Sequence, residues 1–122
     1  MKQVIIPLLL MLLFASFTNR RTDVKLVFQN NTAKDFMVLK VNVRGKEFVF
    51  KNIQQGARTT AIHVPETYRY CYAQAITATD TLICQPTDYV GEKMYHSGKF
   101  LMKLFSLPGQ KYMGMDFEAL PR

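Results

Sequence analysis

The sequence predicts an all-β fold, a small antiparallel β-sandwich of about seven or eight strands behind an N-terminal leader. From Asp23 onward, apolar residues alternate with polar residues, which is the period of half-buried strands. Glycine and proline fall mainly between these runs, where turns are expected. No segment after the leader has the helical spacing of apolar residues over a useful length. Strands of this number in about 100 residues are typical of a β-sandwich or a small barrel, and we expect the sandwich.

The first 18 residues have the layout of a secretory signal peptide. A short basic start precedes the apolar run VIIPLLLMLLF, and the small and polar segment ASFTN follows it. The apolar run is shorter than the roughly 20 residues that a membrane-spanning helix needs. We therefore expect residues 1–18 to be removed on export and residues 19–122 to form a single β-sandwich domain without a transmembrane segment. An uncleaved anchor, which the basic pair Arg20-Arg21 would favour, is the alternative.

The first predicted hairpin joins the segments FMVLKVNVR and KEFVFKNI. Met37, Leu39, Val41 and Val43 are expected to point into the core, and Arg44-Gly45 to form the turn. Pairing Val43 with Lys46 then places large apolar residues opposite one another on one face and mixed residues on the other. That division is what an antiparallel hairpin over a core requires.

The last predicted hairpin joins KFLMKLFSL and QKYMGMDFEAL around Pro108-Gly109, a dipeptide suited to a type II turn. Pairing Leu107 with Gln110 aligns Phe100, Met102 and Leu104 with Phe117, Met115 and Met113. The same register sets Lys99 opposite Glu118 on the other face. Gly114 interrupts the second strand, which indicates a bulge or a close backbone approach.

Two further strands are expected around the cysteines, in the segment YRYCYAQAITATDTLICQP, and another in residues 57–64. The expected sandwich is immunoglobulin-like in architecture but lacks the marks of a true immunoglobulin domain. Tryptophan is absent, and Cys71 and Cys84 are only 13 residues apart. Leu82 also stands where an immunoglobulin domain carries a tyrosine, two residues before the second cysteine.

Cys71 and Cys84 are candidates for a disulfide, because oxidation is usual in an exported chain. With a four-residue loop from Ile76 to Thr79, the two cysteines lie directly opposite each other, within bridging distance. With a two-residue loop, Cys84 instead faces Ala73, and the diagonal separation is too long. Two buried free thiols are the competing interpretation.

The charge and the remaining motifs argue against several functions. The net charge is +7, but the lysines are scattered, so no segment resembles a nucleic-acid-binding tail. Neither cysteine has a neighbouring ligand at zinc-site spacing, and no phosphate-binding glycine loop is present, so we expect neither a metal nor a cofactor. Asn30-Asn31-Thr32 is a glycan acceptor motif, which matters only in a eukaryotic secretory host.

An enzyme is a weaker possibility. No nucleophile elbow of the form G-x-S-x-G is present, and adjacency of His96 and Ser97 does not make a catalytic pair. Asp80, Asp88 and Glu92 could form an acid/base pair or a calcium site, but their spacing does not match an EF-hand-type loop.

Tyrosine is the strongest indication of a binding surface, because its ring is a rigid apolar plate with a polar tip. Three tyrosines alternate along one face of an expected strand, and the other candidates lie in the long loop of residues 86–98. The candidate partner-binding residues are Tyr68, Tyr70, Tyr72, Asp88, Tyr89 and Tyr95. The competing interpretation is that these rings simply cover the sandwich.

We therefore expect a secreted or periplasmic, non-catalytic binding or accessory module whose partner is a protein or polysaccharide of the cell envelope. A basic protein is drawn to anionic envelope polymers by its long-range field. One alternative is a small inhibitor of a secreted or envelope enzyme that presents the long loop. Another is an enzyme that uses loop residues.

Overall fold

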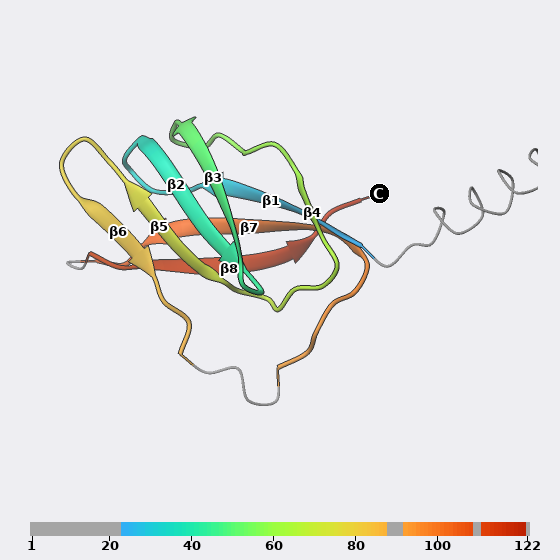
Figure 1. The fold of residues 1–122 in the computed structure, drawn as a ribbon. Coiled ribbons are helices and arrows are strands. Elements are labelled where there is room, and N and C mark those ends of the chain that lie inside the picture. The colour runs from blue at the N-terminus through green and yellow to red at the C-terminus, as the bar shows by residue number, and fades with distance from the viewer. Residues whose placement is uncertain (1–22, 88–91, 109–110, 122) are drawn as a thin grey trace, which may run out of the picture.

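The structure is a computed structural model, and it describes residues 23–87, 92–108 and 111–121. In this part of the chain, eight strands form two four-stranded sheets that pack face to face (Figure 1). The predicted all-β sandwich is therefore confirmed. The predicted signal peptide and the Arg20-Arg21 pair lie outside the described residues. Within the described residues, no helix is long and apolar enough to cross a membrane.

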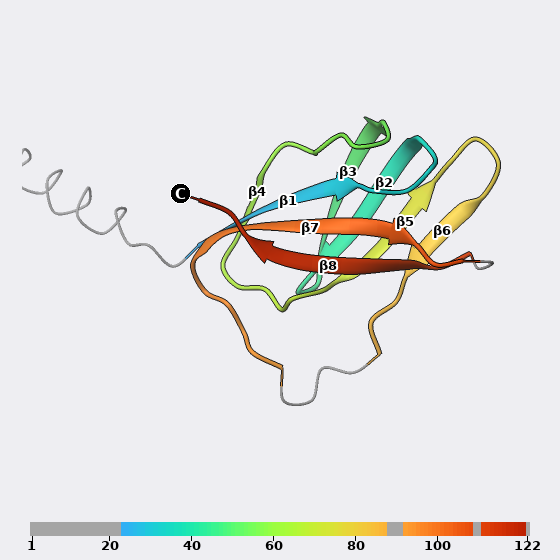
Figure 2. The same ribbon diagram turned by 180° about the vertical axis from the view of Figure 1, so that it is seen from behind.

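The strands of the first sheet are, in order, β4 (Ile62–Val64), β1 (Val24–Asn30), β7 (Gly98–Ser106) and β8 (Met113–Ala119). Those of the second sheet are β3 (Lys46–Ile53), β2 (Phe36–Val43), β5 (Tyr72–Ile76) and β6 (Thr81–Cys84). Strand β1 runs parallel to β7, and the other pairs are antiparallel. Figure 2 shows the first sheet in front of the second.

The strand order differs from that of an immunoglobulin constant domain. There, the first two strands share a sheet and the second and third lie in different sheets. Here β1 and β2 lie in different sheets, and β2 and β3 form a hairpin within one sheet. The sandwich architecture was predicted correctly, but the observed connections are not those of an immunoglobulin constant domain.

The hydrophobic core lies between the two sheets and is built from alternate residues of their strands. On β1, Val24, Leu26 and Phe28 are all completely buried, as their spacing of two predicts. The core also contains, from the other strands, Leu39, Val41, Val43, Ala73, Ala75, Leu82, Phe100, Met102, Leu104 and Met113. The fold thus depends on apolar burial along strands whose opposite faces remain more polar.

The β2–β3 hairpin has the predicted register, with Val43 opposite Lys46 and Val41 opposite Phe48. Arg44 and Gly45 both have positive φ angles, 53° and 88°. Positive values at both central residues are what a two-residue hairpin turn matched to strand twist requires. The Asn42 side-chain oxygen accepts a hydrogen bond from the Gly45 N–H at 2.9 Å and secures the turn.

The predicted inward position of Met37 is wrong, because this side chain is 53 % exposed. Its neighbour Phe36 is buried instead, paired with Ile53. Asn52, which precedes Ile53, has a positive φ of 57°. This left-handed residue breaks the regular alternation at the end of the hairpin and lets Phe36 and Ile53 turn towards the core.

The β7–β8 hairpin differs from the prediction by two residues. Met102 lies opposite Phe117 and Leu104 opposite Met115, and the predicted pairing of Lys99 with Glu118 is not formed. The Leu107 N–H donates to the Tyr112 carbonyl at 3.1 Å, so the connection is longer than the expected two-residue turn. Glu118 instead lies 3.3 Å from the Lys103 ammonium. Gly109 of the expected turn lies outside the described residues.

The β5–β6 hairpin is also displaced from the expected register. Ala73 lies opposite Cys84, Ala75 opposite Leu82 and Ile76 opposite Thr81. The Thr77 N–H donates to the Asp80 carbonyl at 2.9 Å, which closes a two-residue loop. Side-chain hydrogen bonds within this turn favour the shorter loop over the four-residue alternative.

Candidate functional site

The structure brings Tyr68, Tyr70 and Tyr72 together around one pocket of about 350 Å³. The opposite wall of the pocket is residues 42–45 at the end of the β2–β3 hairpin, and Thr67 and Cys71 complete the lining. We call this depression the tyrosine pocket. Its volume falls within the roughly 300–1,000 Å³ typical of small-molecule sites.

The three tyrosines do not form one regular strand, contrary to the prediction. Strand β5 begins only at Tyr72, and residues 68–71 are irregular. Thr67 and Cys71 are buried at the two ends of this short segment. The intervening tyrosines are partly exposed and line the pocket.

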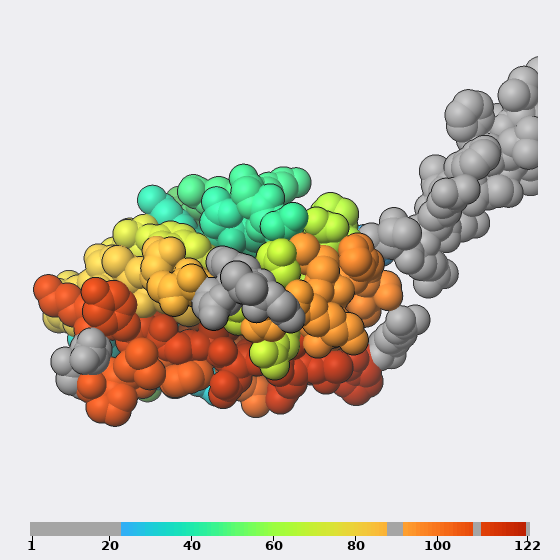
Figure 3. All heavy atoms as spheres, turned by 90° about the horizontal axis from the view of Figure 1, so that it is seen from below, coloured from blue at the N-terminus to red at the C-terminus, as the bar shows by residue number. Residues whose placement is uncertain are grey.

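Thr67 fixes the start of this segment against the long loop. Its N–H donates to the Tyr95 carbonyl at 2.9 Å, and the Tyr95 N–H donates back to Thr67 at 2.8 Å. The Thr67 hydroxyl also donates to the Tyr68 carbonyl at 2.8 Å. Figure 3 shows the consequence on the surface, where the orange segment after residue 91 lies against the yellow-green part of the chain.

The hairpin wall comes next to the tyrosines because β2 and β5 are neighbours in the second sheet. Asn42 lies directly opposite Tyr72 in this pairing. The Arg44-Gly45 turn therefore projects beside the irregular segment that precedes β5. The pocket is formed by two parts of the chain that are more than 20 residues apart in the sequence.

Charged groups at the rim of the pocket are paired with one another. The Arg44 guanidinium donates to Glu66 Oε2 from Nη2 at 3.1 Å, and its central carbon lies 5.3 Å from the centre of the Tyr68 ring. His96 Nε2 lies 3.4 Å from the other Glu66 oxygen. Glu66 thus links the β2–β3 hairpin to the long loop, and its charge offsets that of Arg44.

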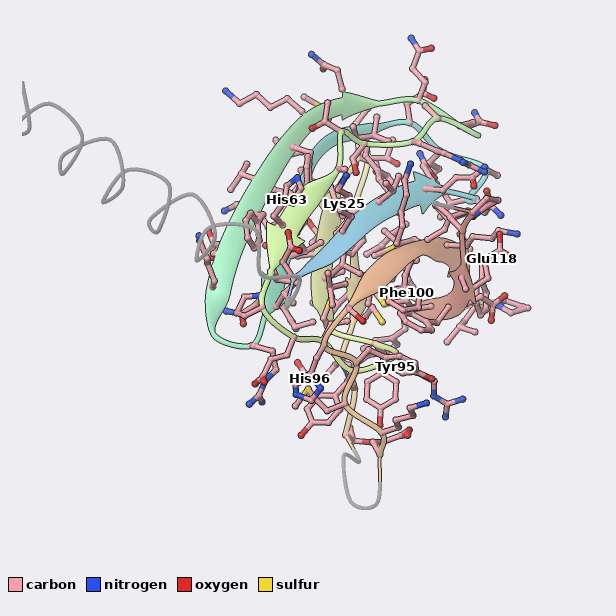
Figure 4. All side chains as sticks on the ribbon, turned by 90° about the vertical axis from the view of Figure 1, so that its right-hand side faces the viewer. Lys25, His63, Tyr95, His96, Phe100 and Glu118 are labelled. Carbon is pink, nitrogen blue, oxygen red and sulfur yellow. The ribbon has the colours of Figure 1, made fainter. Side chains whose placement is uncertain are left out.

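Tyr95 has a structural position and does not line the tyrosine pocket. Its ring is half-buried, with its centre 5.2 Å from that of Phe100 and 5.1 Å from that of Phe117. Figure 4 shows Tyr95 and His96 at the end of the sandwich where the long loop enters β7. The candidates Asp88 and Tyr89 lie outside the described residues.

A second depression of about 330 Å³ lies beside the first, on the other side of Tyr70. Its lining includes residues 84–87 after β6 and the methionines Met113 and Met115 of β8. This hollow is more open to solvent than the tyrosine pocket. Tyr70 lines both depressions, so its ring is shared between two neighbouring surfaces.

Arg69 does not line the tyrosine pocket and pairs with the long loop. Its Nη2 lies 3.2 Å from Glu92 Oε1. The hydrogen bond and the negative charge of Glu92 raise the pKa of the Arg69 side chain. This ion pair and the Thr67–Tyr95 bridge both attach the later part of the loop to the segment that carries the tyrosines.

Both cysteines are free and buried in the structure. The register predicted for a disulfide is wrong, since Cys84 faces Ala73 and Cys71 is on the diagonal. Burial raises the pKa of both thiols, and for Cys71 the nearby Cys84 adds to the effect. A thiol held in its protonated form is a poor nucleophile, so neither group has the surroundings of a catalytic cysteine.

Of the residues considered for catalysis, those that the structure describes do not assemble into one site. Asp80 lies in the β5–β6 turn and contacts the Lys34 ammonium, whereas Glu92 pairs with Arg69. The two histidines are also apart (Figure 4), with His63 on β4 lying 3.2 Å from Asp23. Among the described residues, no group of three or more side chains is placed to hold a metal ion.

The asparagine of the glycan acceptor motif, Asn30, uses its side chain in hydrogen bonds that hold the fold together. Asn30 is completely buried, and its amide donates to the carbonyls of Lys34 and Ile53 at 2.8 and 2.9 Å. Its side-chain oxygen accepts from both the N–H and the hydroxyl of Thr32. In the folded protein this amide holds the β1–β2 turn and is inaccessible for modification.

Sequence reasoning missed Asn42, Arg44 and Thr67 as lining residues of the pocket. The Arg44-Gly45 turn was recognised, but its position beside the tyrosines depends on β2 and β5 being neighbours. No local pattern in the sequence predicts that adjacency. Comparison with known proteins finds no family model and no curated protein that matches this chain.

Proposed function

We propose that the protein is an exported, non-catalytic binding module of the periplasm or extracellular space and that the tyrosine pocket is its binding site. The observation that carries this proposal is the convergence of three tyrosines on one pocket opposite the β2–β3 hairpin. Aromatic plates with polar tips, combined with amide and hydroxyl groups, are typical of recognition surfaces.

The pocket best suits an uncharged, polar unit such as a sugar ring of an envelope polysaccharide. Sugar rings offer apolar C–H faces to aromatic plates and hydroxyl groups to polar side chains. Asn42 supplies an amide, and Arg44 is already matched by Glu66. A charged ligand would have to compete with that ion pair, whereas a neutral ligand would leave it in place. The positive net charge, +7 for the full chain and still positive without residues 1–18, would bring the protein to an anionic envelope.

Binding to isolated envelope polysaccharide tests this proposal. The Tyr70→Ala/Tyr72→Ala protein should bind at least about tenfold more weakly, because it removes two aromatic surfaces from the pocket. Tyr112→Ala is the matched control, since Tyr112 is 51 % exposed and does not line the pocket. Calorimetric titration and a thermal melt on each protein separate lost binding from unfolding. Equal affinity of the folded double variant and the parent would overturn the proposed site.

An inhibitor of a secreted or envelope enzyme is the second candidate, and the attachment of the long loop favours it. The Arg69–Glu92 ion pair and the Thr67–Tyr95 backbone hydrogen bonds attach residues 92–95 of the loop to the body of the sandwich. Residues 92–95 are held in place before binding, so they would lose less entropy when they dock. Arg69→Ala should therefore weaken capture of a target hydrolase, whereas sugar binding at the tyrosine pocket should not change.

Export is tested by the intact mass of the protein recovered from its own host. Loss of about the first 18 residues from a periplasmic or extracellular fraction is expected. A full-length mass confined to the membrane fraction would contradict cleavage and favour an anchored protein.

A further inference from the structure

We propose that two copies of this protein associate through β3, which pairs with its own counterpart in antiparallel orientation about a two-fold axis at Val49. The pairing would join two four-stranded sheets into one continuous sheet of eight strands. This surface is separate from the tyrosine pocket, so the proposal does not depend on the proposed function.

Strand β3 is the terminal strand of the second sheet, beyond β2 (Figure 1). It has eight residues, whereas the terminal strands β4 and β6 have three and four. Strand β6 is also engaged along its outer edge, where the Ile83 N–H donates to the Lys111 carbonyl at 3.0 Å. A long terminal strand presents a row of backbone groups to which another strand can bind.

The β2–β3 turn determines which backbone groups of β3 face outwards. A two-residue turn makes its flanking residues, Val43 and Lys46, a hydrogen-bonded pair, and such pairs recur at every second residue. Phe48 and Phe50 therefore bond to β2. The N–H and C=O groups of Glu47, Val49 and Lys51 point to the free edge and are available to a second strand.

The side chains of Glu47, Val49 and Lys51 are complementary to the same three side chains in a second, antiparallel copy of β3. When Val49 of one copy lies opposite Val49 of the other, Glu47 of each copy faces Lys51 of its counterpart. Opposite charges directly across an antiparallel pair are favourable. The same register places Phe48 opposite Phe50 on the core-facing side, where both rings are half-buried.

No other register of the two β3 strands preserves these contacts. A shift of two residues would set Val49 opposite Glu47 or Lys51 and lose both ion pairs, and a shift of one would put core-facing residues opposite outward-facing ones. Strand β8, the other long terminal strand, contains Asp116 and Glu118 but no basic residue. Two copies of β8 that paired with each other therefore could not form an ion pair between their strands.

The side chains that would meet are available in the single chain. Val49 is 50 % exposed, and within the described ranges neither Glu47 nor Lys51 takes part in an ion pair. A lysine on a terminal strand ordinarily prevents two such strands from pairing, because the lysines of the two copies would be brought together and lose their hydration. Here the four-residue spacing from Glu47 to Lys51 converts that repulsion into attraction.

Cross-linking at the proposed axis tests the register. Two Val49→Cys residues would face each other in a hydrogen-bonded pair, with Cα atoms about 5.5 Å apart, which a disulfide can span. Mild oxidation of the exported protein should give a covalent dimer that reduction reverses. Met37→Cys, equally exposed on β2 but not at the edge, is the matched control and should stay monomeric. Equal cross-linking of the two variants would overturn the proposal.

Charge reversal tests the ion pairs independently. Sedimentation should show a concentration-dependent dimer for the parent protein, and Lys51→Glu should weaken it about tenfold or more, since both symmetric pairs become repulsive. The double variant Glu47→Lys/Lys51→Glu should restore the dimer. Lys111→Glu changes the net charge equally and should leave association unchanged. A parent protein that is monomeric at all concentrations, or a double variant that stays monomeric, would contradict this interface.

Discussion

Phe105 and Gly114 face each other across β7 and β8, and their contact shows how tightly single residues constrain the sandwich. A Cβ atom added at Gly114 would lie 2.3 Å from the tip of the Phe105 ring. The ring thus covers the glycine backbone, which is a recurrent way to compensate for glycine in a strand. The sequence predicted a bulge or a close backbone approach at Gly114, and the group that lies against this glycine is the side-chain ring of Phe105.

Gly114→Ala should lower the free energy of unfolding by about 1–2 kcal/mol, because the Phe105 ring must leave its position. Urea denaturation followed by circular dichroism measures this change. In a Phe105→Leu background, the same glycine substitution should cost less, since the clashing ring is absent. An unchanged denaturation midpoint for Gly114→Ala would show that the ring does not lie over the glycine.

The buried thiols support a second prediction at this scale. Because burial raises the pKa of Cys71 and Cys84, little thiolate forms at pH 8. In the reduced, folded protein, alkylation by iodoacetamide should be at least about tenfold slower than in denaturant. The exposed thiol of Met37→Cys, which lies away from the proposed dimer edge, provides the reference rate for an accessible cysteine. Rapid modification of the native protein would contradict the burial of the pair.

At the scale of elements, the β5–β6 turn is held by a hydrogen-bond network and an ion pair. The Thr77 hydroxyl donates to Asp80 Oδ1 at 2.6 Å and accepts from the Asp80 N–H at 3.0 Å. Lys34, from the β1–β2 connection, lies 2.6 Å from Asp80 Oδ2. The ion pair therefore ties this turn of the second sheet to the connection that joins the two sheets.

This network predicts a dependence of stability on pH. The hydrogen bond from Lys34, followed by that from Thr77, lowers the pKa of Asp80 in the folded protein. The interaction therefore stabilises the fold above the unfolded pKa of about 3.9 and is lost as the pH falls through the folded value. Asp80→Asn should be less stable than the parent at pH 7, and the difference should shrink towards pH 2. A constant difference across this range would rule out the ion pair as its source.

The hairpins show which structural features sequence reasoning could reach. The β2–β3 register was predicted because the alternation and the Arg44-Gly45 turn agree on one pairing. The β7–β8 and β5–β6 registers were each missed by two residues. A shift of two leaves every side chain on the same face of the sheet, so apolar alternation cannot distinguish such registers.

The grouping of the three tyrosines could be predicted from the sequence, but the surface opposite them could not. The spacing of Tyr68, Tyr70 and Tyr72 suggested that they act together, and all three line one pocket. Their partner surface, the Asn42 to Gly45 end of a hairpin, follows from the order of strands in the sheet. That order depends on packing between distant parts of the chain, which local pattern does not encode.

At the scale of the whole molecule, the two proposed surfaces are compatible. The tyrosine pocket lies at the end of the second sheet, formed by the β2–β3 turn and the segment before β5. The proposed dimer uses the free edge of β3. A dimer would therefore present two pockets, and binding to a repeating polysaccharide would gain from their linkage.

The most direct test of the central claim is an amide chemical-shift titration of the isotope-labelled protein with a soluble fragment of envelope polysaccharide. We expect the shifts to be confined to residues 42–45 and 67–72, the two walls of the tyrosine pocket. The Tyr70→Ala/Tyr72→Ala protein should show no such shifts while keeping the rest of its spectrum. Saturable shifts that lie elsewhere on the sandwich, or none at saturating fragment, would contradict the assignment of this pocket as the binding site.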